Sequence, residues 1–358
     1  MAATVYLIEA SKNLSEAELS RRIGLVYHRL APENMIQKRD LTAVKIHFGE
    51  QGTTGYIKPA WISDIIDDFK KRKVRAFWTD TNTLYVGRRS NAVEHLQLAH
   101  GHGFSLERTR LPVLIADGLI GRDILEFEVG LPRIKTAKIA RVFAESDSLL
   151  CLSHFTGHIL TGFGAALKNM GMGCASRQGK LDQHSDVHPW IDKEKCVKCL
   201  RCLPGCPTGA LQELEDSVFI QDESCIGCGE CLVLCRNDAV RMQWDNEDGR
   251  VQEKMAEYAL SVHRLFKGKV LYINVILDIT KDCDCMSQNS HVIAEDIGIA
   301  GSLDPVALDL ASAELVLKKS GRDVLREANH PDWRQQLEHA ESIGLGTRDY
   351  ELLTLDVD

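Results

Sequence analysis

The sequence predicts an α/β fold in which a mostly parallel sheet with flanking helices is interrupted by a small cysteine-rich unit. Short apolar runs typical of buried strands alternate with amphipathic helical patterns in the first half of the chain. The same alternation returns towards the C-terminus, after a dense block of cysteines. Repeated alternation of strands and helices is typical of parallel sheets with helices on their faces.

The composition is that of a globular protein that can bury its own core. Of the 358 residues, 44% are hydrophobic and 26% are charged. Lys and Arg number 43 against 51 Asp and Glu, without a long basic run, so we expect no nucleic-acid partner. No apolar stretch is as long as a membrane span, and the N-terminal run soon meets Glu9 and Lys12 instead of forming a signal peptide. We therefore expect a cytoplasmic protein without a membrane partner.

Local patterns place the elements of the first half. Ser15 followed by Glu18 forms a capping-box pattern and predicts the start of a helix. Pro59 suits the first turn of another helix. Strands are predicted at residues 43–48, 76–79, 113–116 and 149–152, and helices at 59–71 and 91–100.

The same patterns resume after the cysteine block. They predict a helix at 251–265, a strand at 270–277 and a helix at 305–319, with Asp304 as the N-cap of the last helix. Since alternation continues on both sides, we expect the block to be a small α+β domain inserted into one α/β domain. The predicted division is 1–187 and 246–358 for the α/β domain and 188–245 for the insert, and two consecutive domains are the alternative.

The cysteine block is an internal repeat of two copies that align without a gap, IDKEKCVKCLRCLPGCPTGAL and IQDESCIGCGECLVLCRNDAV. Each copy contains C-x-x-C-x-x-C-x-x-x-C, the spacing of bacterial ferredoxins that bind two 4Fe–4S clusters. A pair of zinc sites is the alternative, but zinc motifs pair two Cys-x-x-Cys units across a longer loop. Pro207 follows the last cysteine of the first copy, whereas Arg236 stands at that place in the second.

The spacing also predicts which cysteines share a cluster. In a two-cluster module, the fourth cysteine of each copy binds the cluster of the other copy. The predicted ligands are Cys196, Cys199, Cys202 and Cys235 for the first cluster, and Cys225, Cys228, Cys231 and Cys206 for the second.

Two further cysteines lie in the segment TKDCDCMSQ, just after the strand predicted at 270–277. Functional residues of α/β folds gather at the carboxyl ends of parallel strands. Cys283 and Cys285 are alternate residues and would face the same way in an extended segment, so they could bind an additional metal or form a redox pair. The alternative is two incidental thiols in a loop.

Other polar residues follow predicted strands and would meet at one rim of the sheet. His47 lies with Glu50 in KIHFGEQGTTG, His154 and His158 lie in SHFTGH, and Lys168 follows in GFGAALKNMGMG. We expect His47, His154, His158 and Lys168 to be catalytic residues, acting as metal ligands, proton donors or anion contacts. For each histidine, a hydrogen-bonded structural role is the alternative.

The remaining candidates have less specific interpretations. Cys151 ends an apolar run and is expected in the core. Cys174 lies in NMGMGCASRQGK, interpreted as a Gly-rich turn that is either an ordinary connection or a cradle for an anion. His95, His100 and His102 are expected at the surface or at the end of a helix.

Several segments are distinctive in combination. They are KIHFGEQG, SHFTGH, GFGAALKNMGMGCASRQGKL, the double cysteine motif, DCDC and EDIGIAGSLDPVALDLAS, in that order. Together they resemble a family of iron–sulfur-centre proteins built from a domain of unknown function, family three-six-two, with a ferredoxin insert. The resemblance covers most of the chain and implies the inserted module and its clusters. It implies no substrate.

The sequence therefore predicts an iron–sulfur oxidoreductase that passes electrons through two 4Fe–4S clusters to or from a site on the α/β domain. A redox partner protein and a small-molecule substrate are expected. One alternative is a non-catalytic electron-transfer subunit, and another is a protein that assembles a metal or cofactor through Cys283 and Cys285. No G-x-G-x-x-G motif follows a strand, which gives no sign of a flavin or nicotinamide but does not exclude either.

Overall fold

An eight-stranded sheet forms the centre of the protein. The computed structural model describes residues 2–84, 87–184, 189–206, 208–225, 230–237, 239–241, 250–285 and 290–356. The strand order is β16-β1-β15-β14-β7-β2-β3-β4. The strands are β1 (Ala3–Glu9), β2 (Leu41–Lys45), β3 (Arg75–Asp80), β4 (Val113–Ile115), β7 (Ser148–His154), β14 (Val270–Ile276), β15 (Gly298–Ser302) and β16 (Tyr350–Thr354).

The sheet is mostly parallel, as predicted. The five strands from β14 to β4 run parallel to one another, and β16 is parallel to β1. Only β15 runs against its two neighbours, β1 and β14, within this sheet. The chain therefore has an α/β fold whose carboxyl strand ends from β14 to β3 lie at one rim.

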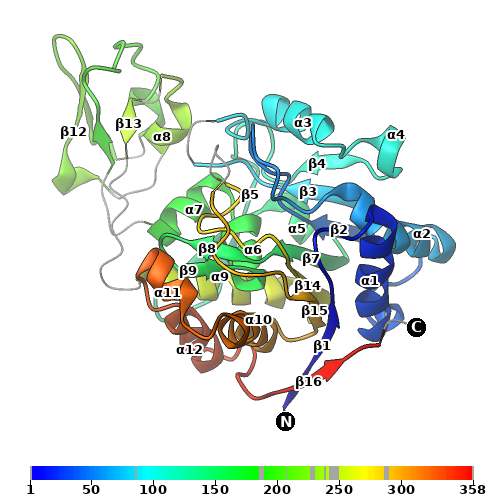
Figure 1. Cartoon of the computed structure of the whole chain (residues 1–358). Coiled ribbons are helices and arrows are strands. Elements are labelled where there is room, and N and C mark those ends of the chain that lie inside the picture. Colours follow the sequence, from blue (N-terminus) through cyan, green and yellow to red (C-terminus); the bar gives the residue numbers. More distant parts are fainter. Residues whose placement is uncertain are drawn as a thin grey trace.

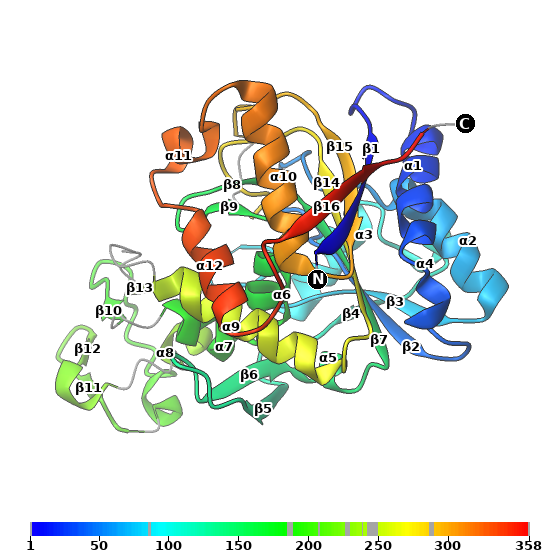
Figure 2. The same ribbon diagram turned by 90° about the horizontal axis from the view of Figure 1, so that it is seen from below.

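Helices cover both faces of the sheet (Figures 1 and 2). One apolar layer contains residues of α1, α2 and α3, and the opposite layer contains residues of α6, α9, α10, α11 and α12. The helices of the first layer are α1 (Glu16–Arg29), α2 (Ser63–Arg72) and α3 (Ala92–Gly101). Those of the second layer are α6 (Ala166–Cys174), α9 (Arg250–Leu265), α10 (Pro305–Ser320), α11 (Val324–Asn329) and α12 (Arg334–Ser342).

Shorter elements complete the main body. They are α4 (Leu106–Thr109), α5 (Arg141–Ala144), α7 (Arg177–His184), the 3-10 helices η1 (Pro32–Asn34) and η2 (Pro59–Ile62), and two antiparallel pairs, β5 (Ile124–Glu128) with β6 (Thr136–Ala140) and β8 (Thr156–His158) with β9 (Gly162–Gly164). Among the described residues, no helix is long and apolar enough to cross a bilayer.

The described parts of the cysteine segment form a small lobe beside the main body (Figure 1). Its elements are β10 (Trp190–Ile191), η3 (Leu203–Gly205), β11 (Leu211–Glu213), β12 (Val218–Ile220), η4 (Asp222–Ser224), α8 (Glu230–Leu234) and β13 (Val240–Arg241). Strands of the central sheet precede it and follow it in the chain. The predicted boundaries near residues 187 and 245 fall at segments outside the described residues, so the division into domains stays a prediction.

Most predicted elements are present within a few residues. Ser15 caps α1 by accepting a hydrogen bond from the Glu18 N–H at 3.2 Å. Asp304 caps α10 through the N–H groups of Val306 and Ala307, at 2.9 and 3.0 Å. The strand predicted at 43–48 ends earlier, at Lys45, and the chain leaves the sheet there.

Two predictions are wrong. The Gly-rich segment around Cys174 is helical rather than a turn, because its glycines allow close packing between helices. A Cβ at Gly171 would lie 2.3 Å from the carbonyl oxygen of Met255 on α9. His95 is fully buried instead of exposed, since its ring packs edge-on against Phe48, with ring centroids 5.5 Å apart. Cys151 is buried in the core, as predicted.

Candidate active site

Charged side chains gather where adjacent strands of the parallel sheet end. The strands β14, β7, β2 and β3 are neighbours, and their carboxyl ends form one rim. Lys45 is the last residue of β2, Asp80 the last of β3 and His154 the last of β7. The fold therefore brings three polar residues together by ending three neighbouring strands at the same level.

An ion-pair network forms the floor of this rim. The Lys45 ammonium lies 2.9 Å from an Asp80 oxygen and donates to the side-chain amide oxygen of Asn169 at 2.6 Å. The Arg89 guanidinium contacts the other Asp80 oxygen at 3.4 Å and the Glu50 carboxylate at 3.1 Å. All four charged side chains are buried. Although burial raises the pKa of Asp80, the nearby charges, with Lys45 the largest and Arg89 among them, outweigh it and hold that pKa well below its usual range.

His47 presents a hydrogen-bond donor to this rim. Its Nδ1 accepts from the N–H of Gly49 at 3.0 Å, so Nε2 carries the ring proton. Nε2 is buried and has no hydrogen-bond partner in the described part of the chain. Burial, with the charge of Arg89 second, lowers the pKa of His47 well below its ordinary value. The neutral ring therefore offers an N–H to any acceptor that enters the site.

His154 and Asp284 form a buried pair beside it. His154 Nδ1 lies 2.8 Å from the Asp284 carboxylate, and Nε2 lies 2.6 Å from the Leu277 carbonyl oxygen. Both partners are acceptors, so both ring nitrogens donate and the ring is an imidazolium. Burial lowers the pKa of His154, but the carboxylate more than compensates and the net shift is upward. Burial likewise raises the pKa of Asp284, while His154 brings it below its usual value.

Lys168 extends from α6 into the same charged group. Burial lowers the pKa of its amine to about 8, with Arg89 adding to the effect and Asp284 opposing it. It makes no hydrogen bond to any residue that the structure describes. An ammonium with a pKa this close to neutrality can bind an anion or exchange a proton.

Cys283 and Cys285 flank Asp284 in the chain and are bonded to each other as a disulfide. The ligand atoms of His158, Cys283 and Cys285 lie within 4.8 Å of one another. Burial, followed by the charge of Lys168, lowers the pKa of His158 well below its usual value. The predicted rim residues thus fall into two neighbouring groups, the charged group with His47, His154 and Lys168, and a sulfur–imidazole group with His158.

Several members of the rim were not predicted from the sequence. Asp117, after β4, accepts from the Asn82 N–H and side-chain amide through one oxygen, at 2.9 and 2.8 Å, while its other oxygen is buried and has no hydrogen-bond partner among the described residues. Burial raises the pKa of Asp117 to about 6. Burial lowers the pKa of Lys180 to about 8. A lysine inside the apolar run AVKIHF was the available signal for Lys45, because a buried strand accepts a charge only beside a partner.

The cysteine segment has its own small apolar core. Leu211, Val218, Ile220, Cys231 and Val240 are buried there, and Cys196, Cys202, Cys206, Cys225 and Cys235 pack against them. Among the predicted ligands, the structure has free thiols at Cys196, Cys199, Cys202, Cys206, Cys225 and Cys235. Cys228 lies outside the described residues.

Both copies of the repeat place an N–H group at the fourth cysteine in the same way. The Ala210 N–H donates to Cys206 Sγ at 3.2 Å, and the Ala239 N–H donates to Cys235 Sγ at 3.3 Å. Partial burial raises the pKa of Cys202, and the neighbouring sulfurs of Cys199, Cys235 and Cys196 add to it. The first three cysteines of one copy thus lie near the fourth cysteine of the other.

The cysteine segment contacts the main body close to the rim. Leu232 of α8 packs against Leu84 and Leu181. Leu84 follows β3 by four residues, and its carbonyl oxygen accepts from the Arg177 guanidinium at 3.3 Å. The contact therefore joins the helix within the second cysteine motif to the loop that leaves the rim at Asp80.

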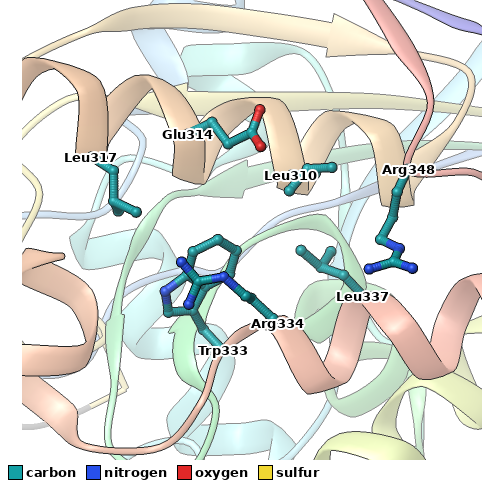
Figure 3. Close-up of a pocket in the computed structure, with 7 residues that line it drawn as sticks. All are labelled: Leu310, Glu314, Leu317, Trp333, Arg334, Leu337 and Arg348. Atoms are coloured by element: carbon teal, nitrogen blue, oxygen red, sulfur yellow. The ribbon is translucent and has the colours of Figure 1, made fainter.

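A separate pocket of about 340 Å³ lies between α10 and α12 (Figure 3). Leu310, Leu317 and Leu337 line it with Trp333, and Arg334 and Arg348 lie at its border with Glu314. None of its lining residues belongs to the rim. We therefore place the candidate active site at the charged strand ends.

Comparison with known proteins gives a family and distant structural similarity. Residues 42–314 match the family described as Domain of unknown function (DUF362). No curated protein matches the sequence. Among solved structures, the lactate racemase apoprotein from Thermoanaerobacterium thermosaccharolyticum is 14% identical with a TM-score of 0.46, covering 88% of this chain and 57% of that one. A crystal structure of a Thermotoga maritima protein is 11% identical with a TM-score of 0.45, covering 88% of this chain and 60% of that one. This chain spans less than two thirds of either.

Proposed function

The chain belongs to the family described as Domain of unknown function (DUF362), and we propose that it is an iron–sulfur oxidoreductase with two 4Fe–4S clusters and a substrate site at the charged rim. The cysteine repeat carries this proposal. Its spacing is specific for two cubane clusters, which supply one-electron transfer when bound. We propose residues 188–245 as the inserted cluster domain, and the cytoplasm as the compartment.

The cysteine segment fits the clusters in its donor set. Soft thiolates are the ligands that iron–sulfur clusters take, and N–H groups beside ligand sulfurs tune such centres. The matching N–H donors at Cys206 and Cys235 support this use. The proximity of Cys202 to Cys196, Cys199 and Cys235 supports the proposed first ligand set, and Cys225, Cys228, Cys231 and Cys206 form the second.

The rim fits a small substrate that carries an acceptor oxygen or a negative charge. His47 offers a buried N–H that no described residue accepts from, and Lys168 offers an amine with a pKa of about 8. Lys45 and Arg89 are neutralised by Asp80 and Glu50, so they hold the floor in place. His154 orients the Asp284 loop through its two hydrogen bonds. We propose that Lys168 exchanges the proton that accompanies electron transfer to or from this substrate.

The contact of Leu232 with Leu84 supports electron exchange between the two parts. It brings the helix within the second cysteine motif against the loop that follows Asp80. A redox partner protein would then exchange electrons with the outer side of the cysteine segment.

Paired cysteine variants test the cluster assignment in protein purified without oxygen. Cys202→Ala/Cys235→Ala removes two ligands of one proposed cluster, so we expect about half of the wild-type iron and sulfide to remain. The matched variant Cys202→Ala/Cys206→Ala removes one ligand from each proposed cluster and should lose nearly all of both. Equal iron in the two variants would contradict the shared ligation, and wild-type protein without iron and sulfide would contradict the proposed function.

A further inference from the structure

Imidazole and sulfur donors meet at the segment that runs past the rim. Asp284 turns towards His154, whereas the residues on either side of it, Cys283 and Cys285, meet His158. The three ligand atoms lie within 4.8 Å of one another. Asp284 and Cys285 lie in a turn that brings the Cα atoms of Cys283 and Cys285 to 5.2 Å from each other, and this turn separates the carboxylate from the two sulfurs.

The His158 ring is held with one nitrogen available as a ligand. The Thr161 hydroxyl lies 2.9 Å from His158 Nδ1 and donates to the Phe163 carbonyl oxygen at 2.7 Å, and the Leu160 N–H donates to Nδ1 at 3.4 Å. Both contacts are to Nδ1, so Nε2 is the nitrogen left to bind a metal. A metal at Nε2 leaves the ring proton on Nδ1, where the Thr161 oxygen accepts it. Metal-binding histidines are usually oriented by such a hydrogen bond from their second nitrogen.

The loop that carries the two cysteines is fixed against the strand that carries His158. The Gly157 N–H donates to the Thr280 carbonyl oxygen at 2.8 Å, and the Asn329 amide donates to the Lys281 carbonyl oxygen at 2.8 Å. A Cβ at residue 157 would lie only 2.2 Å from that Lys281 oxygen. Glycine therefore permits the close approach that places His158 beside the cysteines.

We propose that His158, Cys283 and Cys285 together bind one transition-metal ion of the class that accepts thiolate and imidazole ligands, with Zn²⁺ as the reference ion. Two thiolates and one imidazole match the ligands that zinc takes in proteins. The described residues provide three ligands, and zinc sites with three protein ligands keep a fourth position for water or substrate. This site is separate from the cysteine repeat and does not depend on the proposed clusters.

The metal-bound form requires the two cysteines as thiolates. The disulfide takes up two electrons and two protons from a thiol reductant and becomes two thiols. Each thiol then releases its proton as its sulfur binds the metal. The disulfide and the metal are therefore mutually exclusive. A redox pair alone would require the two sulfurs but no oriented imidazole beside them, so His158 favours the metal site.

The test is zinc binding by the full-length, cluster-containing protein after treatment with a dithiol reductant and removal of excess zinc by a weak chelator. We expect one zinc ion per chain in addition to the iron. Zinc X-ray absorption should show sulfur at about 2.3 Å and nitrogen at about 2.0 Å. Omission of the reductant should prevent binding, because the disulfide then persists.

Four variants make this test specific. Cys283→Ser and His158→Ala should abolish zinc retention. Thr161→Val, which removes the hydroxyl that contacts His158 and the Phe163 carbonyl oxygen but leaves all three ligands, should weaken zinc binding by roughly 10- to 100-fold. Cys174→Ala, at a buried cysteine remote from the group, should bind zinc like the wild type. Iron and sulfide should be unchanged in all four variants, so failure of the cluster proposal is seen separately from failure of the zinc site. Absence of zinc in the reduced wild type, or wild-type zinc in Cys283→Ser and His158→Ala, would overturn the proposal.

Discussion

The buried carboxyl groups of the rim have different pKa values, because their surroundings differ. A buried carboxyl group that contacts a positively charged side chain stays ionised, as Asp80 does beside the Lys45 ammonium. Asp117 has no such contact at its second oxygen, and burial raises its pKa to about 6. The difference follows from the balance between desolvation and nearby opposite charge.

Asp117→Asn should stabilise the protein near neutral pH. The raised pKa of Asp117 means that the folded protein binds this proton more tightly than the unfolded chain, whose pKa is about 3.9. The folded state therefore holds more protons between these two values, and the free energy of unfolding falls by about 3 kcal/mol as pH rises through that interval. The amide keeps the oxygen that accepts from Asn82 and never ionises.

The measurement is the difference in thermal midpoint between variant and wild type at several pH values. The difference should grow from about pH 4 to about pH 6.5 and then stay constant. Asp67→Asn, at an exposed position of α2, is the control and should shift the midpoint little at any pH. A difference for Asp117→Asn that is absent or independent of pH would show that this carboxyl is not destabilised by burial.

Sequence patterns placed His47, His154 and Lys168 at the rim because each follows a strand or its loop. They did not reveal which partner each residue takes. Asp284 pairs with His154 across 130 positions of sequence, and only the folded chain shows that contact. The burial of His95 was also missed, since its helix gives weak periodicity and the contact with Phe48 comes from another element.

At the scale of elements, glycines decide how closely helices approach. Gly171 lies inside α6, where a Cβ would meet the backbone of Met255 on α9. This packing explains why a Gly-rich segment forms a helix despite the low helix propensity of glycine. The strand β15 was missed for a related reason, because its sequence GIAGS contains two glycines and has little β propensity.

Gly171→Ala should destabilise the protein by about 1–3 kcal/mol, because the added methyl group overpacks the contact between α6 and α9. Gly101→Ala is the matched control. Gly101 ends α3 and has no atom within 4 Å of an added Cβ, so the change should be neutral or stabilise by up to about 1 kcal/mol. Chemical denaturation of both variants measures the two effects. A Gly171→Ala protein as stable as Gly101→Ala would refute the close packing of these helices.

At the scale of the whole molecule, the two parts of the chain differ in their sources of stability. The central sheet has an apolar layer on each face, whereas the apolar cluster of the cysteine segment has five buried residues in its described part. A core this small is usually stabilised by metal or disulfides. The sequence predicted the repeat and both flanking sets of strands, but the contact of Leu232 with Leu84 depends on the tertiary fold.

Removal of iron by a chelator should make the cysteine segment the first site of proteolysis. We expect cleavage within residues 189–241, while the resulting N- and C-terminal fragments remain associated. They should stay together because β14, from the C-terminal part, pairs with β7 from the N-terminal part. Limited proteolysis followed by size-exclusion chromatography and mass spectrometry measures both results. The iron-loaded protein is the control, and equally rapid cleavage in the central sheet would contradict a separate cluster domain.

The position of β1 has a consequence for synthesis on the ribosome. Its partners in the sheet, β15 and β16, lie near the other end of the chain. Just beyond β1, the hydrogen bond between Ser11 and Asp296 joins residues that are 285 positions apart. At roughly 5–20 residues per second, β1 emerges about 15–60 s before its first partner strand is translated. During that interval the nascent chain can assemble β2, β3, β4 and β7, but the first strand has an exposed edge that other chains or chaperones can bind. Completion of the sheet is thus a late event in the life of each chain.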